Sequence, residues 1–294
     1  MSAWKDKLFI SFQHLVPQHL LSRLVGKLAD SKTPWVKNTF IKWFTKQYAI
    51  NLSEAKEEIA TNYPSFNAFF TRELKEGVRP IDDNPLHIVS PADGAFSQLG
   101  KIHHNRVFQA KGKDFSLSAL LGGDTQRAAD FIDGEFATIY LSPSDYHRVH
   151  MPVSGTLTHT TYIPGDLFSV NQTTAKGVEQ LFARNERLVA YFDTEFGPMA
   201  MILVGAMIVA GIETVWSGQE APRLKKPIHT PFKGIIPDPV HLNKGEEMGR
   251  FKLGSTVILL FANNKMSWQA GLTADSPIKL GNTIGSATTD ATIS

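Results

Sequence analysis

The chain has 294 residues, of which 42% are hydrophobic and 20% are charged, a composition that supports one large core without disulfides or metal staples. It contains no cysteine, which excludes thiol nucleophiles, CxxC redox pairs, zinc–thiolate sites and iron–sulfur clusters. The net charge of +2 is unevenly distributed: residues 1–50 carry eight lysines and arginines against two aspartates, and the rest carries 22 basic against 26 acidic residues. A basic N-terminal region on an acidic body predicts an anionic partner surface, either lipid or nucleic acid.

The N-terminal region is predicted to be helical. Between residues 4 and 48 the apolar residues recur at helical spacing, and Pro17 and Pro34 divide the stretch into three short helices. Helices that face a protein core have the same periodicity. The interleaved tryptophans, phenylalanines and lysines are also typical of helices that lie in a membrane interface. Both interpretations stay open at this point.

No segment is predicted to cross a membrane or to direct secretion. The longest uncharged apolar run, residues 196–212, has 17 residues and contains four glycines or prolines, whereas a membrane span needs about 20 apolar residues. It therefore predicts two buried strands. The N-terminus has neither a compact apolar h-region nor a small-residue cleavage site, so secretion is not indicated.

From about residue 88 the chain changes to short β-rich runs separated by glycine, proline, asparagine and aspartate. Strands are predicted at 135–141, 156–163, 188–192, 199–204, 207–216 and 255–261. Regular short strands with turn signals favour a sandwich or barrel-like sheet over βαβ units. The predicted fold class is α+β, with N-terminal amphipathic helices followed by a predominantly antiparallel β core.

Ser255 is the first candidate for chemistry. It lies in Leu253-Gly254-Ser255-Thr256, directly before a strongly apolar strand. A tight turn is the default interpretation of Gly-Ser, but glycine also permits the strained backbone that brings the serine hydroxyl against its own preceding carbonyl. Attack there turns the amide into an ester, and elimination followed by hydrolysis leaves a pyruvoyl group. Such self-attack needs a general base and a group that orients it.

His147, His150 and Asp93 are the candidate partners. The histidines follow the strand that ends at residue 141, and the turn residues 142–145 predict a bend that places both histidines on one side. A zinc pair is an alternative, although no cysteine or HExxH helix accompanies it, and each residue could be a structural histidine. Asp93, in Pro91-Ala92-Asp93-Gly94, could equally be a turn aspartate.

Together these segments resemble the phosphatidylserine decarboxylases, pyruvoyl enzymes that convert phosphatidylserine to phosphatidylethanolamine. The matching segments lie in family order and are, with the Leu-Gly-Ser-Thr tetrad at 253–256, residues 66–72, 79–82, 91–94, 146–152, 164–171, 184–187, 196–199 and 249–251. Several matches of this length would not arise together by chance at ordinary residue frequencies.

The resemblance implies roles for the candidate residues. Ser255 is implied to be the nucleophile that cleaves the Gly254–Ser255 bond and the precursor of the covalent pyruvoyl cofactor. Asp93 and His150 are implied to complete the self-cleavage triad. His147 is implied to face the substrate and to help in decarboxylation or reprotonation, in which the lipid amine forms a Schiff base with the pyruvoyl carbonyl.

The resemblance also implies an organisation and partners. Residues 1–62 form a helical membrane-associating region and residues 63–294 a β-rich catalytic domain, self-cleaved into 1–254 and 255–294. The implied partners are an anionic phospholipid membrane and phosphatidylserine, with the two cleaved chains as a heterodimer, its higher oligomeric order left open, and with no nucleic acid and no metal. The implied location is the cytoplasmic side of the cell membrane, bound peripherally.

Two other function classes remain. One is a serine hydrolase that uses Asp93, His150 and Ser255 without self-cleavage, with Thr256 or backbone amides as oxyanion donors. The absence of a Gly-x-Ser-x-Gly elbow counts against it. The other is a non-enzymatic β protein that binds membranes.

Overall fold

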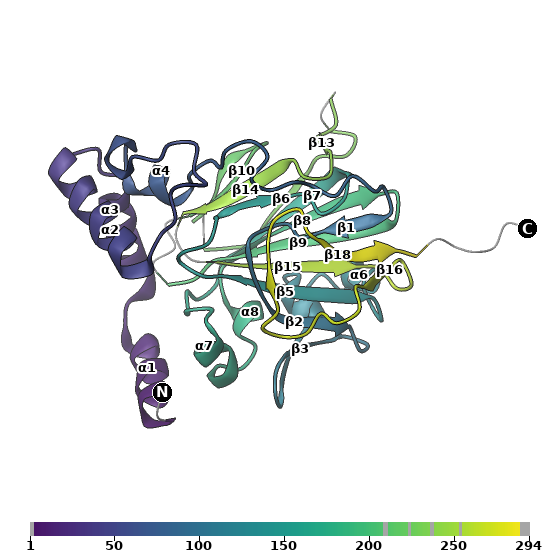
Figure 1. Cartoon of the computed structure of the whole chain (residues 1–294). Helices are drawn as coiled ribbons and strands as arrows, with labels where there is room; N and C mark the ends of the chain where they lie inside the picture. Colours follow the sequence, from purple (N-terminus) through teal and green to yellow (C-terminus); the bar gives the residue numbers. More distant parts are fainter. Residues whose placement is uncertain (1–2, 208–210, 223–224, 236–237, 253–254, 289–294) are drawn as a thin grey trace, which may run out of the picture.

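The structure, a computed structural model, describes residues 3–207, 211–222, 225–235, 238–252 and 255–288. Its N-terminal part forms three helices that stand beside the rest of the molecule (Figure 1): α1 (Ala3–Leu15), α2 (Gln18–Ala29) and α3 (Pro34–Tyr48). Pro17 is the N-cap of α2 and Pro34 begins α3, positions where the missing N–H of proline costs no helical hydrogen bond. The predicted three helices and their boundaries are confirmed. No helix in the described part of the chain has the length and hydropathy needed to span a membrane.

A separate aromatic cluster joins α2 and α3 to the start of the body. The 3-10 helix η1 (Ala60–Asn62) is followed by α4 (Phe66–Phe70). Phe66, Phe69 and Phe70 are buried against Ile41 and Phe44 of α3. Of the three helices, α3 thus packs on α4, whereas the Gln13 side chain of α1 hydrogen-bonds to Thr174 and to the Ser169 amide of the body.

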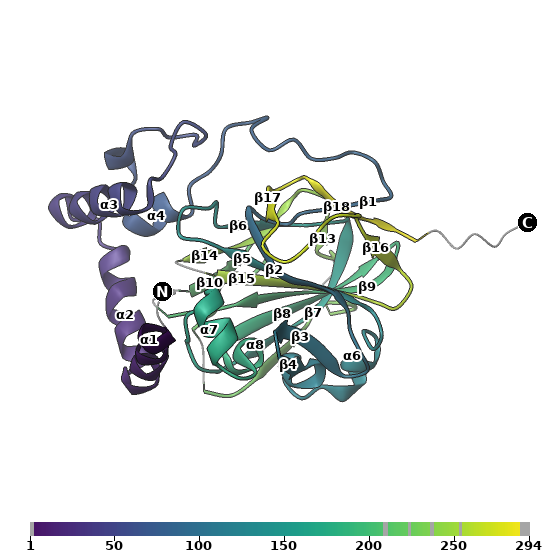
Figure 2. The ribbon, with the colours of Figure 1, turned by 60° about the horizontal axis from the view of Figure 1, so that its bottom comes forward.

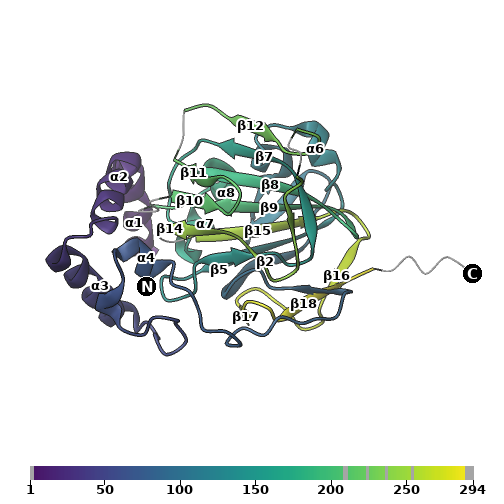
Figure 3. The same cartoon turned by 90° about the horizontal axis from the view of Figure 1, so that it is seen from above.

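The body is built on one antiparallel sheet with the strand order β12-β7-β8-β9-β15-β5-β2-β17, with β13 paired to β7 (Figure 3). The strands of this sheet are β2 (Gly94–Lys101), β5 (Glu135–Leu141), β7 (Gly155–Ile163), β8 (Arg187–Thr194), β9 (Gly197–Val204), β12 (Ile228–Pro231), β13 (His241–Leu242), β15 (Ser255–Phe261) and β17 (Pro277–Ile278). All seven residues of β15 are buried, as expected of a central strand in a sheet that is covered on both faces.

Two smaller sheets cover one face of the main sheet. They have the orders β11-β10-β14-β6 and β1-β18-β16, and their strands are β1 (His87–Val89), β6 (Arg148–His150), β10 (Gly211–Thr214), β11 (Gly218–Ala221), β14 (Glu247–Lys252), β16 (Met266–Trp268) and β18 (Thr283–Ala287). The larger core lies between these layers, where alternate residues of β15 such as Val257 and Leu259 meet Met151 and Phe251.

Short helices and a hairpin cover the opposite face (Figure 2). These elements are β3 (Arg106–Ala110), β4 (Lys113–Ser116), α5 (Leu117–Leu120), α6 (Thr125–Ala129), α7 (Gln172–Gly177) and α8 (Leu181–Arg184). They enclose a second core with the other set of alternate residues, among them Ile258 and Leu260 of β15.

The predicted fold class, α+β with a predominantly antiparallel core, is confirmed. The strands predicted at 135–141 and 255–261 coincide with β5 and β15, and those at 156–163, 188–192 and 199–204 lie within β7, β8 and β9. The apolar run 196–212 contributes to the two strands β9 and β10, as predicted. The strand predicted at 207–216 is found as β10 at Gly211–Thr214, and residues 208–210 lie outside the described part.

Candidate active site

Ser255 is the first residue of the central strand β15. It pairs with Leu141 at the end of β5, and the next residue, Thr256, pairs with Val204 at the end of β9. Its side chain points into the larger core because side chains alternate along a strand and Val257 faces that core. Ser255 has no exposed surface. Gly254, the other half of the predicted cleavage site, lies outside the described residues.

His147 is the side chain that contacts Ser255. The Ser255 Oγ lies 3.4 Å from the His147 Nδ1, and the His147 Nε2 lies 3.0 Å from the carbonyl oxygen of Ser142. Because a carbonyl only accepts, Nε2 carries the proton and the Nδ1 lone pair faces the serine. Burial, followed by the charge of Arg72, lowers the pKa of His147 to about 3. The imidazole is therefore neutral and can accept the serine proton.

The segment that ends α4 fixes the position of His147. The Phe70 ring stacks on the His147 ring with 3.9 Å between centroids. The buried Arg72 donates from Nη2 to the carbonyl oxygens of Ser144 (3.1 Å) and Asp145 (3.4 Å). Sequence reasoning placed both residues in a family segment but gave them no role. The available signal was an arginine close after a run of phenylalanines, because a charged residue beside a run that is expected to be buried needs a polar partner.

Asp93 is held in an ion-pair network at the start of β2. It accepts from the Arg79 Nε (2.9 Å) and Nη2 (2.6 Å), from the Lys279 Nζ (3.1 Å) and from the Leu280 amide (2.9 Å). Burial alone would raise the pKa of Asp93, but the Arg79 and Leu280 hydrogen bonds and the nearby charges outweigh it and leave this pKa below its usual value. Asp93 is thus a buried carboxylate that stays ionised.

His150 lies in β6 and has different partners from His147. Its Nδ1 is 2.8 Å from the carbonyl oxygen of Gly245, and its Nε2 is 3.2 Å from the Tyr146 hydroxyl. Burial lowers its pKa. The ring borders a cavity of about 580 Å³ that Tyr146 and Gly245 also line. Among the described residues, Ser255 forms no hydrogen bond with His150 or Asp93.

The predicted bend is present, but it does not bring the two histidines together. The Asp145 amide donates to the Ser142 carbonyl (2.9 Å), which closes the turn. The histidines come after this turn, and β6 already begins at Arg148. Positions three apart on extended backbone face opposite sides. The expectation that one side holds both histidines is therefore wrong, and the roles of the two stay predictions.

The N-terminal helices leave many large apolar side chains exposed. The exposed fraction is 83% for Leu15 and 74% for Trp35. The same is true of other apolar residues of α1, α2 and α3, namely Trp4, Leu8, Phe9, Phe12, Leu20, Leu24, Leu28 and Trp43. An apolar groove of about 340 Å³ runs between α2 and α3, lined by Leu28, Trp35 and Trp43 among others. A cluster of exposed large apolar side chains is typical of a surface that contacts a protein or a membrane.

The described residues contain no group of three or more histidine, aspartate or glutamate side chains placed to hold a metal ion. Thr256, considered above as an oxyanion donor, has a buried hydroxyl without a hydrogen-bond partner in the described structure. As the residue after Ser255 in a strand, it points to the opposite face of the sheet. It therefore cannot assist Ser255 directly.

Comparison with known proteins gives consistent matches. Residues 66–286 match the family model described as "Phosphatidylserine decarboxylase", and residues 8–49 match a second model described as "PSD". The chain is 57% identical over 290 residues to a protein of Stutzerimonas stutzeri, covering 99% of this chain and 98% of the relative. It is 58% identical over 287 residues to one of Alcanivorax borkumensis, covering 97% and 98%. Both relatives are named phosphatidylserine decarboxylase proenzyme.

Proposed function

Because this chain belongs to the phosphatidylserine decarboxylase family, we propose that it cleaves itself before Ser255 and uses the resulting pyruvoyl group to convert phosphatidylserine to phosphatidylethanolamine and CO2. The chain is a decarboxylase, a carboxy-lyase, and its relatives are named proenzymes. What is proposed here is the self-cleavage, its residues, the cofactor and the membrane partner.

The complete burial of Ser255 against a neutral histidine is the observation that carries the proposal. A nucleophile that attacks an external substrate must be reachable from solvent. A nucleophile that attacks its own preceding peptide bond need not be, and a dry site strengthens each electrostatic interaction in it. For the uncleaved chain the serine hydrolase alternative is accordingly disfavoured, whereas the pyruvoyl group would meet the lipid only after cleavage has freed the end of the strand at residue 255.

Self-cleavage would begin with proton transfer from the Ser255 hydroxyl to a neutral imidazole. The hydroxyl oxygen attacks the carbonyl carbon of Gly254, the C–N bond breaks, and the released amine takes up the proton, so that an ester replaces the amide. Loss of the Ser255 Cα proton then expels the Gly254 carboxylate and leaves dehydroalanine. Addition of water and loss of ammonia convert it to the ketone.

Two assignments of the base follow from two different observations. The family resemblance implies that His150, oriented by Asp93, accepts the proton of the Ser255 hydroxyl. The 3.4 Å contact and the acceptor nitrogen that faces Ser255 favour His147. Variants of the two histidines separate these assignments.

The residues at this position fit a pyruvoyl group. A break before Ser255 leaves its strand hydrogen-bonded to β5 on one side and β9 on the other, and residues of β17 and β18 pair with β2 and β1. The fragments 1–254 and 255–294 would therefore stay together as a heterodimer. When present, the group supplies a ketone that takes up the lipid amine and draws in the electron pair left by CO2. His147, next to Ser255, is placed to exchange a proton there.

The exposed apolar surface of α1–α3 supports a peripheral position on an anionic membrane. Aromatic and leucine side chains would bury in the interface, and lysines such as Lys42 and Lys46 would contribute about 1 kcal/mol each near anionic lipid. The cytoplasmic leaflet, which carries most anionic lipid, is the proposed side. Residues 1–62 would form this membrane-associating region and residues 63–294 the catalytic domain.

A denaturing gel and intact-mass measurement of the purified protein test the proposal. We expect a large fragment that ends at Gly254 and a fragment of 40 residues whose N-terminus is blocked by the pyruvoyl group. Ser255→Ala should remain a single inactive chain. A single uncleaved chain with full decarboxylase activity would refute the self-cleavage.

A further inference from the structure

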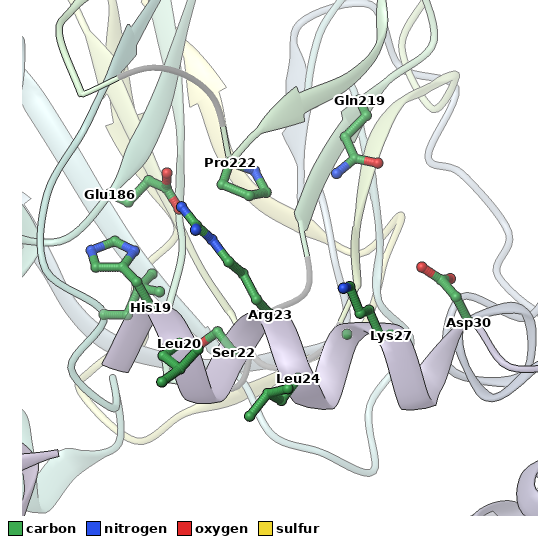
Figure 4. Close-up of a pocket in the computed structure, with 12 residues that line it drawn as sticks. His19, Leu20, Ser22, Arg23, Leu24, Lys27, Asp30, Glu186, Gln219 and Pro222 are labelled. Carbon is green, nitrogen blue, oxygen red and sulfur yellow. The ribbon is translucent and has the colours of Figure 1, made fainter. Parts of the chain in front are cut away.

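A pocket of about 450 Å³ lies between α2 and the end of the body (Figure 4). Residues of α2 form one wall, and Leu167, Glu186, Gln219 and Pro222 form the other. Its volume is in the range of small-ligand sites. The proposed chemistry does not use this pocket.

Arg23 and Lys27 bring positive charge to the pocket. Arg23 and Lys27 are four residues apart, so they share one face of α2. Figure 4 shows both side chains extending from the helix toward the body, that of Arg23 toward Glu186 and that of Lys27 toward the side of Gln219, while Leu20 and Leu24 leave the helix on the other side. Both cations are exposed. Within the described ranges, neither forms an ion pair or a side-chain hydrogen bond.

The two acids that border the pocket already have other partners. Asp30 accepts from the Asn67 amide at 2.6 Å. Glu186 accepts from the Tyr162 hydroxyl at 2.5 Å. Burial raises the pKa of its carboxyl, and this outweighs the lowering by the Tyr162 hydrogen bond and by the charges of His19 and Arg23. Among the described residues, neither acid forms an ion pair with Arg23 or Lys27, although the charge of Arg23 acts on Glu186.

The pocket and Ser255 lie in one row across the main sheet. Continuing the register of Thr256 with Val204 places Ser255 beside Gly205, whose amide donates to the carbonyl oxygen of Glu186 at 2.8 Å. The side chains of Ser255 and Glu186 point to the same face of the sheet. Val257 and Leu188, two positions further along their chains, both face the larger core, and residues two apart in extended backbone share a face. Gly205, between them, has no side chain. Adjacent strands are about 4.8 Å apart, so Glu186 lies about 10 Å from Ser255 across the sheet.

We propose that this pocket binds the phosphodiester of the lipid headgroup, with Arg23 and Lys27 as the residues that hold it. This inference rests on the proposed function and deepens it. The headgroup amine would extend along the row toward position 255. The acyl chains would leave on the side of Leu20 and Leu24, which are 57% and 54% exposed. One helix would thus present cations to the phosphate and leucines to the tails.

Binding by an uncleavable chain tests the inference without any chemistry. Monomeric dihexanoyl-phosphatidylserine is titrated calorimetrically into Ser255→Ala, and into the same chain with Arg23→Gln and Lys27→Gln. The expected loss of affinity is about fivefold for each charge and about twentyfold for both. The exchange Arg23→Lys with Lys27→Arg should bind within about threefold of the parent. Lys111→Gln, which removes an exposed charge from the β3–β4 hairpin, should change nothing.

Unchanged affinity in the double glutamine variant overturns the inference. If that variant does not fold, Lys27→Gln alone is held to the fivefold expectation. Inorganic phosphate is titrated separately, and binding as tight as that of the lipid overturns the assignment to a lipid headgroup. In the mature enzyme, the double variant should raise KM for the same soluble lipid and leave kcat nearly unchanged. Failure of the parent chain to cleave or to decarboxylate refutes the proposed function, whereas an active enzyme with an insensitive KM refutes the pocket alone.

Discussion

The neutral state of the buried His147 makes a quantitative prediction about stability. The unfolded chain exposes this histidine, where its pKa is about 6.5, whereas the folded chain holds the pKa at about 3. Between these two values the unfolded state binds more protons than the folded state. The contribution of His147 to stability is therefore present above pH 6.5 and is lost as the pH falls below it.

The size of the effect follows from the two pKa values. Linkage gives about 1.4 kcal/mol per pH unit below the unfolded pKa. Lowering the pH from 7 to 5 should thus remove about 2 kcal/mol of folding free energy through His147 alone. His147 has no exposed surface, so solvent screening does not reduce this value.

The assay is denaturant unfolding at pH 7 and pH 5, made in the Ser255→Ala background so that all chains are uncleaved. The pH-dependent loss should be about 2 kcal/mol smaller when His147→Gln is added. This difference is independent of what the substitution costs at pH 7. His104→Gln, whose side chain is 95% exposed, is the matched control for the exchange of histidine to glutamine. The same pH dependence with and without His147 would show that the histidine is not held neutral in the folded chain. The assignment of His147 as the acceptor of the Ser255 proton would then be refuted.

Three further predictions concern maturation, the membrane and the Asp93 network. If the family assignment of the base is correct, His150→Ala stays uncleaved on a gel, whereas His147→Ala cleaves at least partly but decarboxylates poorly. The reverse pattern identifies His147 as the base. Normal maturation of both variants refutes both assignments. Lys42→Glu with Lys46→Glu should weaken co-sedimentation with anionic vesicles roughly a hundredfold at low salt and less at high salt, while self-cleavage continues; Lys111→Glu with Lys176→Glu is the charge-matched control, and unchanged binding would mean that α3 does not contact lipid. Lys37 is left in place because its Nζ donates to the Thr61 and Tyr63 carbonyls and holds α3 to η1. Asp93→Asn in the Ser255→Ala background should lower the free energy of unfolding by about 3 kcal/mol in denaturant titration, because it leaves the guanidinium of Arg79 poorly paired. Arg79→Gln should lower it by a similar amount. A loss below about 1 kcal/mol in both variants would show that this network does not stabilise the fold.

The sequence by itself determined the fold class and singled out Ser255 as the candidate reactive serine. The alternation of apolar residues and turn residues predicted the central strands, because side-chain burial on a sheet repeats every two residues. The positions of Pro17 and Pro34 predicted where the three helices begin and end, since proline disrupts a helix anywhere but its first turn. Ser255 was identified because Gly-Ser before a buried strand sits within a set of family segments.

Only the tertiary structure decided which groups surround Ser255. His147 is brought to Ser255 from a segment 108 residues away. Phe70 stacks on its ring and Arg72 binds the turn before it, and no local pattern determines such contacts. The extended backbone of β6 separates His147 from His150, which the turn residues before them did not predict. The row from Ser255 through Gly205 to Glu186 likewise depends on strand register, because β8, β9 and β15 become neighbours only when the sheet forms.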